Sequence, residues 1–333
     1  MRRAAARLAG AFGAPPALTR RRVVVTGIGF VSPLGCGSGG RGTGGPVWAS
    51  LLSGASGVRA LAPADLRGAG DAVSLLGRLP CRIAGVVPRC GPGALDAAFE
   101  ADVYDGAARL ADFSLYAVSA ARSAVADAAP GLVDSYGAGR VGASLGTGIG
   151  SLSSIVAAGA QVASGSERRV SPYFVPTILG NMAAAHVSLA HGLRGPQLAA
   201  TTACAASAHA IGEAYRCVRD GGADAMLAGG SEGSIDALAL VGFSRLRALR
   251  YAERGVCRGS VRAHVGANAC AVAWTRRARS SAWWLVAADA RAHIARDTTT
   301  MQPLPAGRSM LSATDSSWGK AQRSWCSKRW RRR

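Results

Sequence analysis

The sequence lacks the patterns that mark disulfide scaffolds, metal sites and membrane proteins. Its eight cysteines are scattered over 333 residues, and no two of them form a Cys-x-x-Cys pair. This spacing argues against a disulfide framework or a zinc site, and it fits a reducing compartment. No apolar run approaches the roughly 20 residues of a membrane helix. We therefore expect a soluble protein with no membrane span and no bound metal.

Acidic residues are scarce at both ends of the chain. Residues 1–22 contain six arginines and no acid, and residues 251–333 contain 16 basic but only four acidic residues. The stretch between them is nearly neutral, with 17 arginines against 15 acids. An extended nucleic-acid interface needs clustered lysines and arginines, so we expect no nucleic-acid partner.

The first 22 residues have the composition of an organelle transit peptide. They are rich in arginine and alanine, and they could place their apolar residues on one helical face before Pro15 and Pro16. They lack the unbroken apolar core of a secretory signal. We predict a mitochondrial transit peptide at 1–22, with a basic leader that carries no address as the alternative.

Two glycine-rich segments, Arg22–Gly35 and Val141–Gly150, have the spacing of nucleotide-binding turns only in part. The third glycine of the dinucleotide pattern is replaced by Ser32 in the first segment and by Ser151 in the second. The second segment also lacks the Gly-Lys-Ser/Thr of a phosphate loop. We therefore predict no cofactor, and we expect both segments to be strands whose glycines let backbone approach backbone.

The apolar periodicity of the central stretch predicts alternating helices and strands. Helices are expected around 47–52, over 112–129 after an N-cap aspartate, over 181–191, and from Cys204 to about Arg219. Strands are expected at 197–202 and 225–230, with an extended piece at 172–180. This alternation predicts an α/β fold with helices covering a sheet.

Cys204 lies where a small-residue strand meets an alanine-rich helix, in the segment Thr201–Ala214. The first N–H groups of a helix have no intrahelical partner and carry partial positive charge. A thiol held there ionises more readily, and the thiolate is the reactive species. This position predicts a nucleophile; a small core residue is the alternative, since free cysteines are commonly buried.

After residue 250 the sequence changes character. Residues 251–333 hold six of the seven tryptophans and show neither helix nor strand periodicity over long stretches. We expect this basic tail to be largely irregular, disordered or poorly formed helix. Its arginine, alanine and tryptophan content is also typical of a shifted reading frame in a GC-rich gene.

Five segments together resemble the N-terminal half of a β-ketoacyl-[acyl-carrier-protein] synthase, most closely the mitochondrial type. In chain order they are RRVVVTGIGFVSPLG (21–35), SLGTGIGSL (144–152), SPYFVPTILGNMAAAHVSLAHGLRGP (171–196), TTACAASAHAIG (201–212), and DAMLAGGSEGSI with GFSRLRAL (224–249). On this resemblance the synthase domain occupies 23–250, and 251–333 is an unrelated tail.

The resemblance implies a thiolase-like layered sheet-and-helix fold, a homodimer, and an acyltransferase of fatty-acid synthesis whose partner is acyl carrier protein. Cys204 is then the acyl-accepting nucleophile, and decarboxylation of malonyl-carrier protein supplies the two carbons that extend the chain. Phe243 resembles a residue near the acyl pocket, and Arg247 resembles one that faces the carrier protein. A core phenylalanine and a solvated arginine are the alternatives.

The histidine motifs of the family's C-terminal half are missing from this sequence. Neither His264 nor His293, the two histidines beyond residue 250, matches them. His209 cannot easily substitute, because it lies five residues after Cys204, about 140° around a helix. The alternative function is therefore a catalytically inactive truncated isoform that acts only as an interaction protein.

Overall fold

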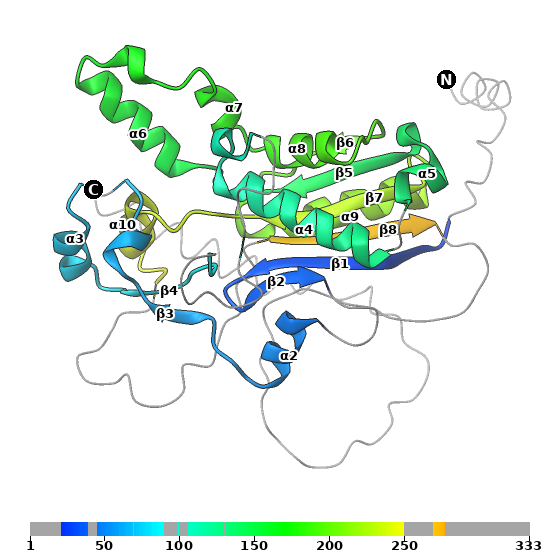
Figure 1. Cartoon of the computed structure of the whole chain (residues 1–333), viewed down its shortest axis with the longest axis horizontal. Coiled ribbons are helices and arrows are strands. Elements are labelled where there is room, and N and C mark those ends of the chain that lie inside the picture. Colours follow the sequence, from blue (N-terminus) through cyan, green and yellow to red (C-terminus); the bar gives the residue numbers. More distant parts are fainter. Residues whose placement is uncertain are drawn as a thin grey trace, which may run out of the picture. The chain divides into compact units, whose positions relative to one another are not determined.

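A six-stranded mixed β-sheet forms the centre of the described chain (Figure 1). The computed structural model describes residues 21–38, 45–68, 70–89, 99, 106–128, 131–249 and 269–276, all within one unit, Met1–Ala290. The strand order is β2-β1-β8-β7-β5-β6. In chain order these strands are β1 (Val23–Ser32), β2 (Gly35–Ser38), β5 (Val141–Gly146), β6 (Gln197–Leu198), β7 (Ala225–Ser231) and β8 (Ala269–Arg276).

Strand direction divides the sheet into a parallel and an antiparallel part. β5 pairs in parallel with β6 and β7, so that Ala143 lies opposite both Gln197 and Leu227. β8 is antiparallel to β1 and to β7, and β1 is antiparallel to β2. Because β5, β6 and β7 run in parallel, their carboxyl ends share one edge of the sheet, where open α/β sheets carry their binding sites.

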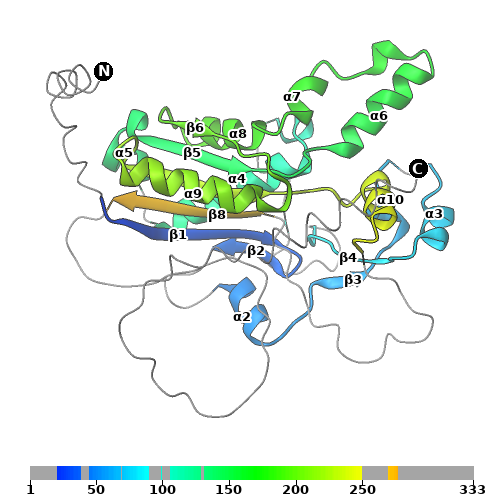
Figure 2. The ribbon, with the colours of Figure 1, turned by 180° about the vertical axis from the view of Figure 1, so that it is seen from behind.

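Helices cover both faces of the sheet. α4 (Asp112–Ala128) and α8 (Met182–Ala190) pack on one face, and α9 (Ala206–Arg219) packs on the other (Figures 1 and 2). Along β7, Leu227 joins the core with α4 and α8, whereas its neighbour Met226 packs with α9. Successive side chains of a strand point to opposite faces of the sheet, so a strand buried on both faces needs apolar residues at successive positions. The predicted α/β fold with helices covering a sheet is confirmed.

Glycines in β1 let α4 lie directly on the sheet. A Cβ at Gly27 would overlap the carbonyl oxygen of Ala124, and a Cβ at Gly29 would overlap that of Ala120. The close approach of backbones that the sequence predicted for these glycines is confirmed. Gly27 and Gly29 face α4, so the packing of this helix is enough to account for the spacing of the two glycines.

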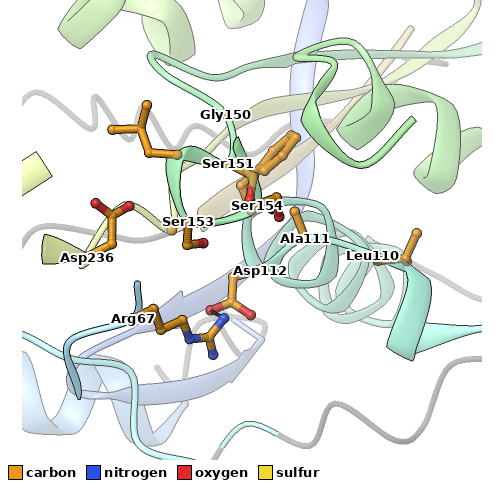
Figure 3. Close-up of a pocket in the computed structure, with 12 residues that line it drawn as sticks. Arg67, Leu110, Ala111, Asp112, Gly150, Ser151, Ser153, Ser154 and Asp236 are labelled. Atoms are coloured by element: carbon orange, nitrogen blue, oxygen red, sulfur yellow. Dashed lines mark hydrogen bonds and ion pairs between the residues drawn. The ribbon is translucent and has the colours of Figure 1, made fainter. Parts of the chain in front are cut away.

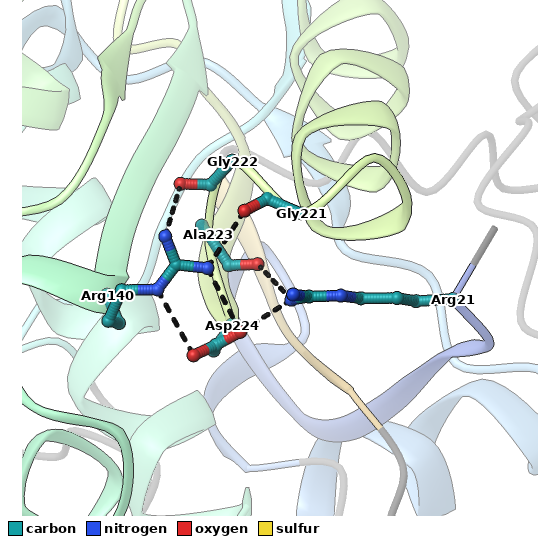
Figure 4. A network of polar contacts seen from close by, with 6 residues as sticks. All are labelled: Arg21, Arg140, Gly221, Gly222, Ala223 and Asp224. Carbon is teal, nitrogen blue, oxygen red and sulfur yellow. Dashed lines mark hydrogen bonds and ion pairs between the residues drawn. The ribbon is translucent and has the colours of Figure 1, made fainter. Parts of the chain in front are cut away.

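A carboxylate ties three strands together at the end opposite the carboxyl edge (Figure 4). Asp224, just before β7, accepts hydrogen bonds from two nitrogens of Arg140 at 3.1 Å and one from Arg21 at 2.6 Å. The hydrogen bond to Asp224 raises the pKa of Arg140. Arg140 also donates to the carbonyl oxygens of Gly221 and Gly222, in the loop between α9 and β7. The network fixes the starts of β1, β5 and β7 relative to one another.

Arg21 belongs to this folded network although it lies within the predicted transit peptide at 1–22. Its backbone N–H also donates to the carbonyl oxygen of Arg219, at 3.0 Å. A leader that is removed without loss of these contacts must end before Arg21. The earlier residues of that segment lie outside the described part of the chain.

A second, smaller core surrounds a two-stranded sheet. β3 (Val58–Ala60) is antiparallel to β4 (Ile83–Gly85), and their neighbours include α3 (Ala72–Arg78) and α10 (Ala237–Arg245). Four buried leucines pack together there: Leu61, Leu66, Leu79 and Leu240. Further helices are α2 (Pro46–Leu52), α5 (Leu132–Tyr136), α6 (Leu152–Ala163) and α7 (Phe174–Ile178).

Two local predictions are wrong. The segment 172–180, expected to be extended, contains α7, because Pro176 falls in the first turn of the helix, where a proline costs no hydrogen bond. Asp112, expected as an N-cap, is the first residue of α4. Its carboxylate pairs instead with Arg67 and Arg89, each at 2.7 Å.

The strand β8 lies inside the segment expected to be irregular, and for Ala269–Arg276 that expectation is wrong. β8 is paired along both edges, from Val23 to Val31 of β1 and along all of β7. Its run of alanine, cysteine and valine, free of glycine and proline, is a strand signal within the tail. Residues 251–268 and 277–333, with His264 and His293, lie outside the described residues.

Candidate active site

Cys204 lies at the carboxyl edge of the sheet, between β6 and α9. It is the middle residue of a 3-10 turn, Ala203–Ala205, that runs directly into α9. The residue is exposed, whereas Cys81 is buried. The alternative that Cys204 fills a core is therefore wrong for the described chain, and its sulfur is open to a reactant at the start of a helix.

The residue before Cys204 has an unusual backbone conformation. Ala203 has φ = 51°, in the left-handed region that L-residues other than glycine seldom occupy. Such a residue costs of order 1–3 kcal/mol and persists only where its surroundings hold it. Strain of this kind is concentrated at functional sites, and here it sets the turn that presents Cys204.

Glycines at the ends of β5 and β7 let the start of α9 lie against the sheet. A Cβ at Gly146 would overlap the carbonyl oxygen of Ala206. A Cβ at Gly230 would stand 2.5 Å from the Cβ of Ser207. Both contacts are too short for any side chain. The glycines therefore fix how closely the helix that follows Cys204 approaches the sheet.

One carboxylate gathers the loops at this edge. Glu232 follows β7, and its Oε2 accepts hydrogen bonds from the N–H groups of Gly148 and Ile149, both at 3.0 Å. Its Oε1 accepts from the N–H of Gly233 at 3.1 Å and from the hydroxyl of Ser234 at 2.8 Å. No sequence motif assigned a role to Glu232. An acid placed directly after a buried strand was the signal that could have indicated one.

The nearby histidines do not contact the cysteine thiol. The Nδ1 of His209 lies 2.7 Å from the hydroxyl of Thr202, in agreement with the expectation that this ring points away from Cys204. Burial lowers the pKa of His186 on α8, and burial together with the charge of Arg122 lowers the pKa of His191, the residue directly after α8. These two rings belong to the packing of α8.

The two predicted substrate-binding residues lie on and after α10. Phe243 is 38% exposed, so it is not a core phenylalanine in the described chain. Arg247 is exposed and has φ = 56°, so it is, after Ala203, a second non-glycine residue in the left-handed region. Their roles in binding an acyl chain and a carrier protein stay predictions.

A small polar pocket lies beside the site at the start of α6, with a volume of about 90 Å³ (Figure 3). Arg67, Asp112 and Asp236 line it; Asp236 lies beside Arg67 in a backbone bridge and caps α10 by accepting the Ala239 N–H at 2.8 Å. Hydroxyls from the first turn of α6 complete it. The pocket does not include Cys204.

Within the described ranges, no group of three or more histidines, cysteines, aspartates and glutamates is arranged to hold a metal ion. Nor does any described helix have the length and apolar content to cross a bilayer. What the site offers is an exposed thiol, backbone N–H groups and a held turn.

With this geometry described, the sequence can be compared with known protein families. The family model for the "Beta-ketoacyl synthase, N-terminal domain" matches residues 20–273. The chain belongs to the β-ketoacyl synthase family. The match extends past residue 250 into β8, so the family-like region is longer at its end than the sequence motifs indicated.

Curated relatives agree with this membership. The mitochondrial 3-oxoacyl-[acyl-carrier-protein] synthase of Arabidopsis thaliana is 42% identical over 236 residues, which are 69% of this chain and 49% of that protein. A 3-oxoacyl-[acyl-carrier-protein] synthase 2 of Rhizobium meliloti (strain 1021) is 39% identical over 232 residues, covering 69% and 51%. The chain spans about half the length of the curated relatives it matches.

Solved structures give the same fold. A β-ketoacyl synthase from Burkholderia phymatum STM815 superposes with a TM-score of 0.60 at 28% identity, over 77% of this chain and 59% of that one. The ishigamide ketosynthase/chain length factor superposes with a TM-score of 0.58 at 26% identity, with the same coverage. The predicted thiolase-like fold, represented by its N-terminal half, is confirmed.

Proposed function

We propose that this chain carries the acyl-accepting half of a β-ketoacyl-[acyl-carrier-protein] synthase, with Cys204 as the nucleophile. The observation that carries the proposal is the exposed Cys204 at the start of α9, directly after the left-handed Ala203. Relatives at 42% and 39% identity bear the synthase name. The acyltransferase class and a role in fatty-acid synthesis follow from those names.

The first step is a thioester exchange. The thiolate of Cys204 attacks the carbonyl carbon of an acyl-carrier thioester and forms a new C–S bond. The C–S bond to the carrier breaks, and the carrier's thiolate leaves and takes up the proton that Cys204 lost. The backbone N–H of Cys204, at the start of the helix, is the proposed hydrogen-bond donor to the carbonyl oxygen on which negative charge develops.

The second step, condensation with malonyl-carrier protein, belongs to the whole synthase. The relatives are about twice as long as the matched region, and the family's C-terminal histidine motifs are absent from this sequence. We propose that the chain alone accepts an acyl group but does not condense it. The alternative of a purely non-catalytic interaction protein has no specific structural observation in its favour.

The test is mass spectrometry of the protein after incubation with acyl-carrier thioester. We expect an acyl adduct on the Cys204 peptide and its loss in Cys204→Ala. Cys217→Ala is the matched control on the same helix, since burial raises the pKa of the Cys217 thiol. An adduct that persists in Cys204→Ala, or no adduct in the wild type, would contradict the proposal.

Phe243 and Arg247 are proposed as contacts for the acyl chain and for the acidic carrier protein. Both side chains are exposed and therefore free to meet a partner. We expect Arg247→Glu to slow acylation of Cys204 by carrier-bound substrate, while acylation by a small acyl thioester is unchanged. Equal slowing of both reactions would remove Arg247 from the carrier interface.

A mitochondrial location is proposed from the arginine-rich start and from the mitochondrial relative of Arabidopsis thaliana. The network of Arg21 with Asp224 adds a boundary: we expect the processed protein to begin at or before Arg21. N-terminal sequencing of protein recovered from mitochondria measures this. A start beyond Arg21, with the fold retained, would contradict the boundary.

A homodimer is also proposed. β6 forms an outer edge of the sheet, and on α8, which contacts β6, Leu189 is 76% exposed. A second copy could cover this side chain and extend the sheet. Sedimentation velocity should give a dimer that Leu189→Asp weakens; a wild-type monomer at all concentrations would refute it.

A further inference from the structure

Glu232 has no role in the thioester exchange, yet its carboxylate is unusually well satisfied. Five donors converge on its two oxygens, three backbone N–H groups and two hydroxyls, at 2.8–3.4 Å. An ionised carboxylate offers about four acceptor sites and no donor, so it suits a place where every neighbour donates. Charge-assisted bonds of this kind are roughly twice as strong as neutral ones.

The loop that Glu232 holds lies against the peptide that carries the nucleophile. A Cβ at Gly148 would stand 3.2 Å from Glu232 Oε2 and 3.4 Å from both the carbonyl carbon and the oxygen of Ala203. The carboxylate and the Ala203 carbonyl therefore approach the same side of Gly148. That carbonyl belongs to the peptide bond that joins Ala203 to Cys204.

Ala203 needs such a support. Its φ of 51° is a conformation that an alanine keeps only when neighbouring groups hold it. On the side of the helix, the N–H of Ala206 donates to the Ala203 carbonyl oxygen. The loop at Gly148 is a second neighbour of that carbonyl, and Glu232 accepts hydrogen bonds from two N–H groups of this loop.

We propose that Glu232 is a positioning residue for Cys204: its carboxylate pins the loop at Gly148 and Ile149, the loop holds Ala203 in its left-handed conformation, and this conformation directs the thiol. The proposal deepens the function proposed above and rests on it for the meaning of that thiol. Glu232 touches no reacting atom.

The test is the rate of Cys204 alkylation by iodoacetamide between pH 6 and pH 9, measured by peptide mass spectrometry in the full chain. Amide hydrogen exchange at Gly148 and Ile149 is measured in parallel. The variants are Glu232→Ala and Glu232→Gln. Glu213→Gln is the matched control, an exposed carboxylate on α9 that accepts a hydrogen bond from Arg216 at 2.9 Å.

We expect Glu232→Ala to speed exchange at Gly148 and Ile149 at least tenfold, because both N–H groups lose their acceptor. The alkylation rate of Cys204 should change at least threefold, with a displaced pH profile. Glu232→Gln should fall between wild type and Glu232→Ala, since its amide keeps one accepting oxygen but turns an NH₂ toward donors. Glu213→Gln should match the wild type.

A folded Glu232→Ala protein with the wild-type pH profile at Cys204 would overturn the proposal. If Glu232→Ala does not fold, Glu232→Gln decides by the same criterion. Alkylation requires neither carrier protein nor condensation. A wild-type Cys204 that is never acylated by carrier thioester would therefore defeat the proposed function, while the alkylation comparison would still test the positioning.

Discussion

Ala203 is a single residue whose backbone conformation conflicts with its side chain, and this conflict can be measured. Ala203→Gly removes a left-handed penalty of about 1–2 kcal/mol but adds backbone entropy to the unfolded chain worth roughly 0.5–1 kcal/mol. We expect the free energy of unfolding to rise by no more than about 1.5 kcal/mol. Ala203→Val, with a branched Cβ, should lower it by more than about 1 kcal/mol. Urea denaturation measures both, and a glycine variant less stable than the valine variant would contradict the strain.

Two histidines, His186 on α8 and His191 directly after it, predict how stability depends on pH. Burial lowers the folded-state pKa of His186 and His191 below 6.5. As pH falls through 6.5, the unfolded chain takes up protons before the folded chain does, so the free energy of unfolding falls. We expect this fall between pH 7.5 and pH 5.5 to be smaller in the double variant His186→Gln/His191→Gln.

The matched control for this pH dependence is His209→Gln, which replaces an exposed histidine. Urea denaturation at each pH gives the free energies. If the double variant and the wild type lose the same stability over this range, the buried histidines are not its source.

At the scale of the elements, the sequence predicted best where apolar periodicity and turn residues agreed. β5, β7, α8 and α9 fall where expected, and the glycines of β1 meet a helix as expected. α3, α6 and α10 were not predicted, since exposed apolar residues on and beside them, such as Val162 at 54% and Leu246 at 74%, leave no clean amphipathic pattern.

The candidate site was predictable at Cys204 and not at its supports. The thiol was visible from the small-residue turn before a helix. The left-handed φ of Ala203 and the loop contacts of Glu232 depend on segments far apart in the sequence, such as β5 and the residue after β7. Such long-range contacts leave no local pattern for a reader of the chain.

Glycine-to-alanine substitutions should have opposite effects on stability at a close backbone contact and at an open position within a helix. Gly29→Ala places a Cβ on the Ala120 carbonyl oxygen, so we expect it to lower the free energy of unfolding by at least about 1–3 kcal/mol. Gly159→Ala is the control: it lies within α6, where an added Cβ would meet nothing within 4 Å. We expect that variant to gain up to about 1 kcal/mol from helix propensity. Calorimetry of both proteins checks the opposite signs, and a stabilised Gly29→Ala would contradict the packing of α4 on β1.

At the scale of the molecule, β8 decides where the domain ends. A chain that stops at residue 268 leaves the facing edges of β1 and β7 without backbone partners, and each buried unpaired group is costly. We expect residues 1–268 to lose cooperative unfolding and residues 1–290 to keep it. Circular dichroism during thermal denaturation compares them. Equal cooperativity in both chains would return the boundary to residue 250, where the sequence motifs end.

The central place of β8 has a consequence for synthesis. Its partner β1 leaves the ribosome among the first residues, and β8 leaves after more than two hundred others. At a translation rate of about 5–20 residues per second, β1 waits on the order of tens of seconds for the neighbour that completes the sheet. During that time the nascent chain presents an open strand edge, so we expect its yield in a cell to rise when chaperones shield β1 until β8 arrives.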